Sequence, residues 1–71
     1  MNIGQAITAL REGRKVTREG WNGAGQFIEL QRPDEHSKMT LPYLYITTVT
    51  GGRVPWLASQ TDILADDWRT V

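Results

Sequence analysis

Three tryptophans are the residues of this sequence whose chemistry most needs an explanation. Trp21 stands directly before an Asn-Gly pair in the stretch GWNGAGQF, Trp56 follows a proline, and Trp68 follows two aspartates. None of them lies in the middle of a clean alternation of apolar and polar residues. A tryptophan at the end of a segment either fills a small core or offers a flat ring on which a nucleobase can stack. Both explanations stay open for each ring.

Neutral hydrogen-bonding side chains lie close to these tryptophans in the sequence. Uncharged donors and acceptors next to aromatic rings suit a nucleobase, a ribose or a sugar. The same residue types also have local roles, because asparagine shapes tight turns and serine or threonine caps helices. The candidate binding residues of this kind are Asn22, Gln26, Ser59, Gln60 and Thr61.

An acidic cluster of Asp62, Asp66 and Asp67 precedes the last tryptophan. One such carboxylate can accept hydrogen bonds from ribose hydroxyls, as an acidic residue does in dinucleotide sites. Helix-end charge and solvated surface are the alternative. The sequence shows no nucleophile with a base beside it, and its one histidine, His36, stands alone in a polar stretch. We therefore expect no enzymatic activity, no catalytic residue, no metal site and no cofactor.

Length and charge narrow the class of protein further. A chain of 71 residues holds one domain, residues 1–71, and a domain of this size is marginally stable on its own. Because there is no cysteine for disulfides, self-association is the remaining remedy and a homo-oligomer is predicted. The formal net charge of zero argues against binding of long nucleic acids, although Arg14, Lys15 and Arg18 could offset a phosphate. No apolar run is long enough for a membrane span and no export signal is visible, so we expect a cytoplasmic protein.

The first predicted element is a short amphipathic helix over residues 3–12. Its apolar residues recur at i, i+3, i+4 and i+7, from Ile3 to Leu10. Asn2 is a candidate N-cap, and Gly13 supplies a left-handed residue that ends the helix. The apolar stripe has to dock on another element.

Strands and turns make up most of the remaining chain. Alternation and β-branched residues predict extended segments, and Gly51-Gly52 predicts a tight hairpin turn. Pro55 lacks an N–H and is therefore expected at a sheet edge or a bulge. Residues 32–42 are predicted to form a long loop with one helical turn around residues 34–37. The predicted extended segments are residues 15–18, 26–31, 43–50, 53–57 and 68–71.

Near the C-terminus, Ser59 and Thr61 are both candidate helix caps. Thr61 is predicted to cap a single turn through residues 63–65, with Asp62 favourably placed in the first turn. The fold class is therefore α+β, with an N-terminal helix and a short C-terminal helical turn on a small, mostly antiparallel sheet.

Three stretches of the chain together resemble one known family. They are GWNG at 20–23, PDEHSKMTLPYLYI at 33–46 and VPWLASQTDILADDW at 54–68. The family is that of the phage anti-Thoeris (Thoeris anti-defence) proteins of the second class. With the N-terminal helix and its basic residues, the resemblance covers almost the whole chain.

The resemblance implies a sponge for a signalling molecule. In Thoeris defence, a TIR-domain protein makes a cyclic ADP-ribose-type messenger that activates a cell-killing effector. Members of the family bind glycocyclic ADP-ribose isomers without cleaving them and form homotetramers with ligand pockets between protomers. Some also take up cyclic oligonucleotide messengers of CBASS-type defence at a separate site. The implied setting is the cytoplasm of an infected bacterium.

The resemblance also implies which residues bind the ligand. Trp21 matches the WNG element and is expected to act as a base-stacking plate on a rigid hairpin. Within the second element, Leu57, Ile63 and Leu64 are assigned to the core. A single-stranded nucleic-acid module and a messenger-degrading enzyme are the alternative functions. The expected ligand contacts are Trp21, Asn22, Gln26, Trp56, Ser59, Gln60, Thr61, Asp62, Asp66 and Trp68.

Overall fold

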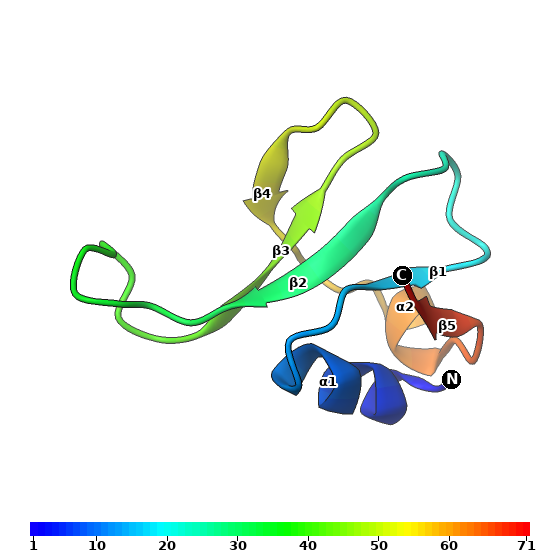
Figure 1. Ribbon diagram of the computed structural model, residues 1–71. Helices are drawn as coiled ribbons and strands as arrows, with labels where there is room; N and C mark the ends of the chain where they lie inside the picture. Colours follow the sequence, from blue (N-terminus) through cyan, green and yellow to red (C-terminus); the bar gives the residue numbers. More distant parts are fainter.

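The computed structural model describes all residues, 1–71, as two helices and five strands (Figure 1). In chain order the elements are α1 (Ile3–Arg11), β1 (Val16–Arg18), β2 (Phe27–Gln31), β3 (Tyr43–Thr47), β4 (Arg53–Pro55), α2 (Gln60–Leu64) and β5 (Trp68–Thr70). The α+β class predicted from the sequence is confirmed. Neither helix is long and apolar enough to cross a membrane.

Helix α1 is capped by residues that the sequence predicted. The Asn2 side chain accepts a hydrogen bond from the Gln5 N–H at 2.9 Å, and the Gln5 side chain accepts one from the Asn2 N–H at 2.9 Å. This reciprocal pair is a capping box. Gly13 has φ +87° and follows the last turn, where the left-handed conformation that ends a helix favours glycine. The helix is confirmed and ends at Arg11, one residue earlier than predicted.

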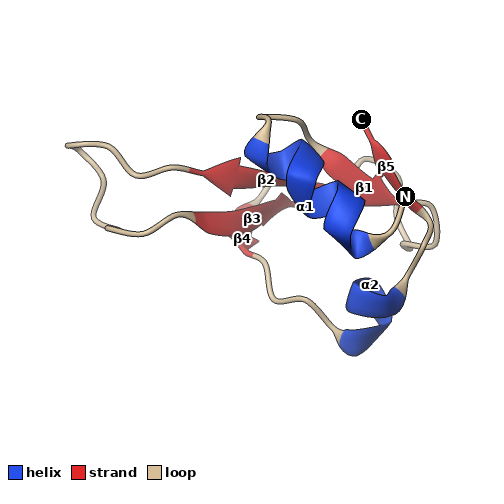
Figure 2. Ribbon diagram, turned by 90° about the horizontal axis from the view of Figure 1, so that it is seen from below, coloured by secondary structure: helices blue, strands red, loops and turns tan.

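All five strands form one sheet in the order β4-β3-β2-β1-β5, and every neighbouring pair is antiparallel. Ile28 of β2 lies opposite Val16 of β1 and Ile46 of β3, so these three side chains share one face. Helix α1 lies along that face (Figure 2). No helix covers the opposite face, which we call the open face.

The core between α1 and the sheet is small. Only 8 of the 71 residues are buried, and six of these are apolar. The largest is Trp68, with 2% of its surface exposed. So few buried side chains leave the isolated chain with little apolar stabilisation. The six core residues are Ala6, Ala9, Leu10, Val16, Ile28 and Trp68.

Strand β3 is shorter than predicted because the turn after it is longer, and β4 begins at Arg53 as predicted but ends at Pro55. The Thr48 N–H donates to the Gly52 carbonyl at 2.8 Å and the Gly51 N–H donates to the Thr48 carbonyl at 2.9 Å, so the turn starts at Thr48. Pro55 lies in β4, an edge strand, as expected for a residue without an N–H. In the long loop, residues 34–37 form a single turn and no helix.

The region around α2 differs from prediction in two ways. The N-cap is Ser59 and not Thr61, because the Ser59 hydroxyl accepts from the Asp62 N–H at 3.1 Å. Leu57, Ile63 and Leu64 are not core residues: they are 92%, 44% and 82% exposed. The physical reason is that this five-residue helix turns Asp62, its only buried residue, toward the body of the protein.

Candidate functional site

The three tryptophans meet in one cluster, although they come from three separate segments. The ring centroids of Trp21 and Trp68 are 5.3 Å apart at an interplanar angle of 78°, and those of Trp56 and Trp68 are 5.9 Å apart at 87°. Trp21 and Trp56 are 6.4 Å apart. The two pairs that include Trp68 have the edge-to-face arrangement that aromatic rings prefer, and the Trp21–Trp56 pair is tilted at 58°. Trp68 fills the core, whereas Trp21 and Trp56 are half-buried and pack against it.

Asp62 lies beneath this cluster and accepts hydrogen bonds from it. Its Oδ1 accepts from Trp21 Nε1 at 2.9 Å and from Arg18 Nη1 at 2.8 Å, and its Oδ2 accepts from the Ser59 N–H at 3.2 Å. Its backbone carbonyl accepts from Trp68 Nε1 at 3.0 Å. Burial acts to raise the pKa of Asp62, but the hydrogen bonds from Trp21, Arg18 and Ser59 outweigh it and lower the pKa from 3.8 to about 2.

Arg18 joins two of the three acidic residues into one network. Its Nε donates to Asp67 Oδ1 at 2.8 Å, and Asp67 Oδ2 accepts from the Gly20 N–H at 2.8 Å. The hydrogen bonds with Asp67 and Asp62 raise the pKa of Arg18, and the Arg18 hydrogen bond lowers the pKa of Asp67. Arg18 is therefore paired within the chain, while Asp66 is exposed.

A polar hollow of about 310 Å³ opens beside the glycine-rich loop after Trp21. Gly23 and Gly25 have φ of +91° and +87°, and a Cβ at Gly23 would lie 2.8 Å from Val49 Cγ2, so glycine is needed there. The hollow is also lined by residues that were not candidates from the sequence, such as Phe27 of β2 and Arg69 of β5. They lie together only because of the register in which β1 pairs with β2 and β5. Its lining comprises Thr17, Arg18, Glu19, Trp21, Gly23, Ala24, Gly25, Gln26, Phe27, Arg69 and Val71.

Two cations stand near this hollow. Arg69 Nε lies 3.2 Å from Glu19 Oε1, with both side chains more than half exposed. Lys15 Nζ lies 4.8 Å from the centroid of the Phe27 ring. An exposed ion pair contributes little to stability, so the Arg69 guanidinium can turn toward a phosphate at small cost.

The expected ligand contacts fall into three groups. Trp21, Trp56, Trp68, Ser59 and Asp62 are brought together in the tryptophan cluster and the groups bonded to it. Gln26 lines the hollow, and its side-chain amide donates to the carbonyl of exposed Asn22. Gln60, Thr61 and Asp66 are exposed and lie outside the lining of the hollow.

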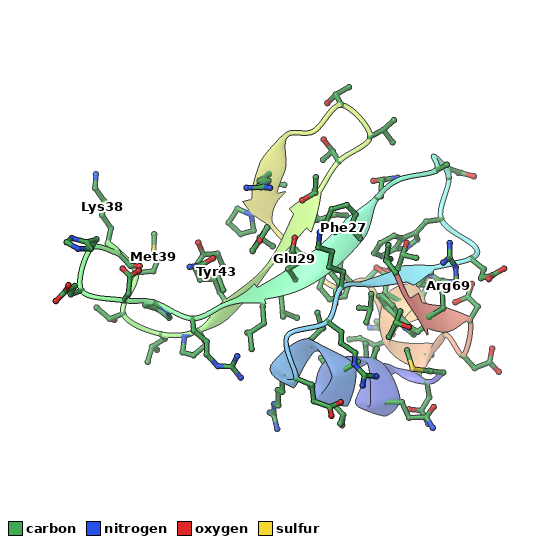
Figure 3. The ribbon with its side chains drawn as sticks, viewed as in Figure 1. Phe27, Glu29, Lys38, Met39, Tyr43 and Arg69 are labelled. Atoms are coloured by element: carbon green, nitrogen blue, oxygen red, sulfur yellow. The ribbon has the colours of Figure 1, made fainter.

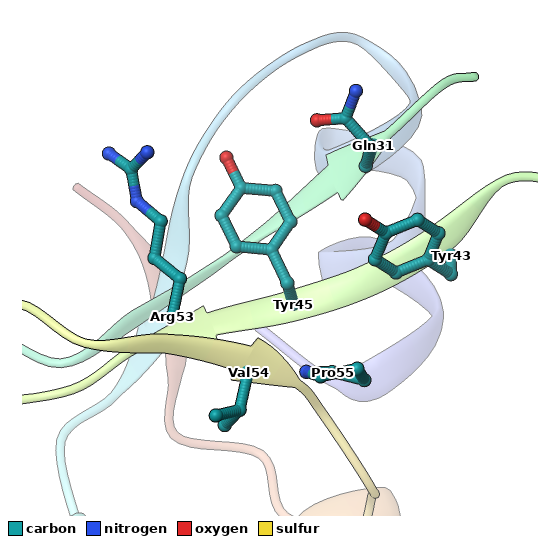
Figure 4. Close-up of a pocket in the computed structure, with 6 residues that line it drawn as sticks. All are labelled: Gln31, Tyr43, Tyr45, Arg53, Val54 and Pro55. Carbon is teal, nitrogen blue, oxygen red and sulfur yellow. The ribbon is translucent and has the colours of Figure 1, made fainter. Parts of the chain in front are cut away.

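A second hollow, of about 190 Å³, lies on the open face between β2, β3 and β4 (Figure 4). Figure 3 shows Phe27, Glu29 and Tyr43 on the side of the sheet away from α1. Arg53 lies 6.0 Å from the Tyr45 ring centroid, and burial, followed by the nearby Glu29 carboxylate, raises the pKa of Tyr45. The lining is Gln31, Tyr43, Tyr45, Arg53, Val54 and Pro55.

Comparison with known proteins identifies the family. A family model described as Tad2-like, the Thoeris anti-defense 2-like domain, matches residues 1–71. The chain belongs to this family. It is 31% identical to "Thoeris anti-defense 2" of Bacillus phage SP01 over an alignment of 84 positions that covers 100% of this chain and 94% of the relative. The resemblance inferred from the three sequence stretches is confirmed, and membership of the Thoeris anti-defense 2-like family supports a phage anti-Thoeris function.

Proposed function

We propose that this Thoeris anti-defense 2-like domain binds a cyclic ADP-ribose-type messenger, of the glycocyclic ADP-ribose class, and holds it without cleaving it. The sequestered messenger then fails to activate the Thoeris effector. Such a sponge lowers the free messenger only when its own concentration exceeds both the Kd and the messenger concentration. The place of action is the cytoplasm of the infected bacterium, where the messenger is made.

The observation that carries the proposal is the polar hollow beside Trp21 in a chain of this family. An adenine ring needs an aromatic surface, two riboses need neutral donors and acceptors, and a pyrophosphate needs limited positive charge. Trp21 and Phe27 supply rings, Gln26 supplies an amide, and Arg69 supplies a cation. At about 310 Å³ the hollow is at the lower limit for a ligand pocket, roughly 300–1,000 Å³. A second copy of the chain would complete the enclosure.

We also propose that the chain forms a homo-oligomer, and a tetramer by its resemblance to the family. The support is a charge-poor segment, residues 39–65, in which only Arg53 and Asp62 are charged. Asp62 is 9% exposed, so Arg53 is the only charged residue that this segment exposes. Figure 2 shows β3, β4 and α2 of this segment along one side of the molecule. Apart from the terminal residues Met1 and Val71, every large apolar residue that is exposed lies in it: Met39, Leu41, Tyr43, Val49, Val54, Leu57, Ile63 and Leu64.

Recovery of the ligand tests the sponge directly. The purified protein is mixed with excess glycocyclic ADP-ribose, freed of unbound ligand and heated, and the released compound is identified by chromatography and mass. Intact messenger is expected. A cleaved product would make the protein a messenger-degrading enzyme, and no release would reject this ligand. A parallel sample with a CBASS cyclic oligonucleotide asks whether a second class of messenger is held.

A pair of matched variants links that ligand to the hollow. Arg69→Gln removes the cation at the hollow and should weaken messenger binding about tenfold, the loss of one charge-assisted hydrogen bond. Arg53→Gln removes a cation from the β3–β4 end of the open face, outside the lining of this hollow, and should leave the affinity unchanged. Equal effects of the two variants would contradict the placement of the ligand.

Single-stranded nucleic acid is the second candidate ligand, and the open face favours it. Phe27, Tyr43 and Tyr45 present rings there, with Arg53 beside them, and stacking on sheet-borne aromatics is a common mode of binding bases. The tryptophans, in contrast, pack together against or within the core, and Trp21 is the one that also lines the polar hollow. Filter binding of oligonucleotides at low and moderate salt separates the functions, because only a nucleic-acid module shows steep salt dependence.

A further inference from the structure

Asp62 is the one residue to which both the loop tryptophan and the core tryptophan donate their indole N–H groups. We propose, for the messenger-binding function given above, that Asp62 is a positioning residue: it fixes the orientation of the Trp21 ring and does not itself touch the messenger. This assigns Asp62 a different role from the ligand contact expected from the sequence motif.

The occupancy of the carboxylate argues against contact with a ligand. Three donors, from Trp21, Arg18 and Ser59, already converge on its two oxygens at 2.8–3.2 Å. The side chain is only 12% exposed. Of the four or so acceptor sites of a carboxylate, only one on Oδ2 is left unoccupied. Because so little of the side chain is exposed, a ribose hydroxyl has poor access to that site, and displacing one of the bound donors would leave the donor unpaired in a partly buried place.

The same contacts explain how the Trp21 ring is held. The loop that carries it contains three glycines, Gly20, Gly23 and Gly25, and by itself places little restriction on the ring. The bond from Trp21 Nε1 to Asp62 fixes one edge of the indole, and the Trp68 ring packs against it at 5.3 Å. The ring therefore has its binding orientation before any ligand arrives, which lowers the entropy cost of binding.

Arg18 extends this control to the backbone of the loop. It bonds to Asp62 at 2.8 Å and to Asp67 at 2.8 Å, and Asp67 in turn accepts from the Gly20 N–H immediately before Trp21. One ion-paired network thus bonds the Trp21 side chain to α2 and the Gly20 backbone to the segment before β5. Networks of this kind fix a single arrangement when every member is bonded.

A ligand-free measurement tests the positioning role by itself. In a ¹H–¹⁵N spectrum the indole signal of Trp21 is assigned by its absence in Trp21→Phe. In the wild type, three donors share the two oxygens of the Asp62 carboxylate. Asp62→Asn leaves them a single, uncharged acceptor oxygen. The hydrogen bond from Trp21 should therefore weaken, and the Trp21 indole proton should shift upfield and broaden. Glu35→Gln makes the same kind of change, from carboxylate to amide, at a residue of the long loop whose side chain is 86% exposed. It should leave the Trp21 indole signal in place. An unshifted Trp21 indole in folded Asp62→Asn overturns the positioning role, whether or not the protein binds a messenger.

A double-mutant cycle tests the consequence for binding. Trp21→Phe keeps an aromatic ring but replaces the indole by a smaller phenyl ring without an N–H, and Asp62→Asn replaces the charged acceptor by a neutral one, so both variants act on the same hydrogen bond. Each should weaken glycocyclic ADP-ribose binding about tenfold, and the double variant should also lose only about tenfold, since coupled sites are not additive. Independent losses, about a hundredfold in the double variant, would show that Asp62 contacts the ligand itself. If wild-type protein binds no messenger, the proposed function fails, and the indole measurement still decides the positioning role.

Discussion

The two ends of the sheet are completed in different ways. At the β1–β5 end, Arg18, Asp62 and Asp67 pair with one another, and three tryptophans pack together beside them. At the β3–β4 end, the charge-poor segment leaves leucine, valine and methionine side chains in water. At the first end, charged and aromatic side chains contact partners within the chain, whereas at the second end apolar side chains stay exposed. A chain too small to cover all its apolar surface thus pairs its charged side chains internally at one end and leaves apolar side chains exposed at the other, where we propose that a second copy packs.

Removal of the core tryptophan should have the largest effect on the β1–β5 end. Trp68→Ala should destabilise the fold by roughly 3–5 kcal/mol, because it leaves a large cavity. A domain of this size is expected to have a total stability of about 4–11 kcal/mol. Circular dichroism during thermal unfolding should therefore show a largely unfolded or very labile variant. Trp68→Phe is the control, because it retains an aromatic ring and leaves a smaller cavity, although it also loses the hydrogen bond to the Asp62 carbonyl. A cooperative transition of Trp68→Ala near the wild-type temperature would contradict the role of Trp68 as the core of this end.

The exposed leucines of the charge-poor segment should respond in assembly and not in folding. Leu57 and Leu64 are 92% and 82% exposed, so replacing both by glutamate should leave the fold of a protomer unchanged. If a second copy covers them, the loss of about 1.5 kcal/mol for each leucine weakens assembly about a hundredfold. Light scattering with size-exclusion chromatography measures the mass. The double variant Thr8→Glu/Thr70→Glu adds the same charge at exposed positions outside the segment and should keep the wild-type mass. An unchanged mass in the leucine variant would place the interface elsewhere.

Acid should weaken the β1–β5 end and spare the β3–β4 end. The folded pKa of Asp62, about 2, lies below its ordinary value of 3.8. Its ionisation therefore contributes about 2 kcal/mol above pH 4, and this contribution is lost as the pH falls toward 2. The pKa of Asp67 is lowered too, so its effect has the same sign. Urea unfolding at pH 5 and pH 2.5 should show this loss in the wild type and a smaller one in Asp62→Asn. Equal losses in the two proteins would mean that another group causes the acid sensitivity.

Local chemistry in the sequence predicts the elements of this fold well. The i, i+3, i+4, i+7 spacing, the Asn2 cap and Gly13 predict α1, and Pro55 predicts a sheet edge. These signals act within a few residues, so no knowledge of the tertiary arrangement is needed to interpret them.

The parts that could not be predicted depend on which segments meet. Leucines at 57 and 64 look like core residues in any sequence, because apolar residues are usually buried in a monomer. Leu57 lies in the segment before α2, and the exposure of Leu64 follows from the orientation of α2, which is set by the long-range bonds of Asp62 to Arg18 and Trp21. Likewise, Arg69 reaches the hollow only because β5 returns to pair with β1.

The smallest expected effect distinguishes two neighbouring hydroxyls at the β1–β5 end. Ser59→Ala removes the oxygen that accepts from the Asp62 N–H at 3.1 Å, and loss of an N-cap costs about 1 kcal/mol. Thr61→Ala, at the residue that sequence reasoning chose as the cap, should change the stability by a few tenths of a kcal/mol at most, since Thr61 is exposed and its hydroxyl caps nothing. Because the backbone N–H of Ser59 still donates to Asp62 in the alanine variant, the carboxylate keeps all three of its donors. Urea midpoints of the two variants should therefore differ, with the Trp21 indole signal unmoved in both. A larger loss in Thr61→Ala would mean that α2 begins at a different residue and that Asp62 is held in place by something other than this cap.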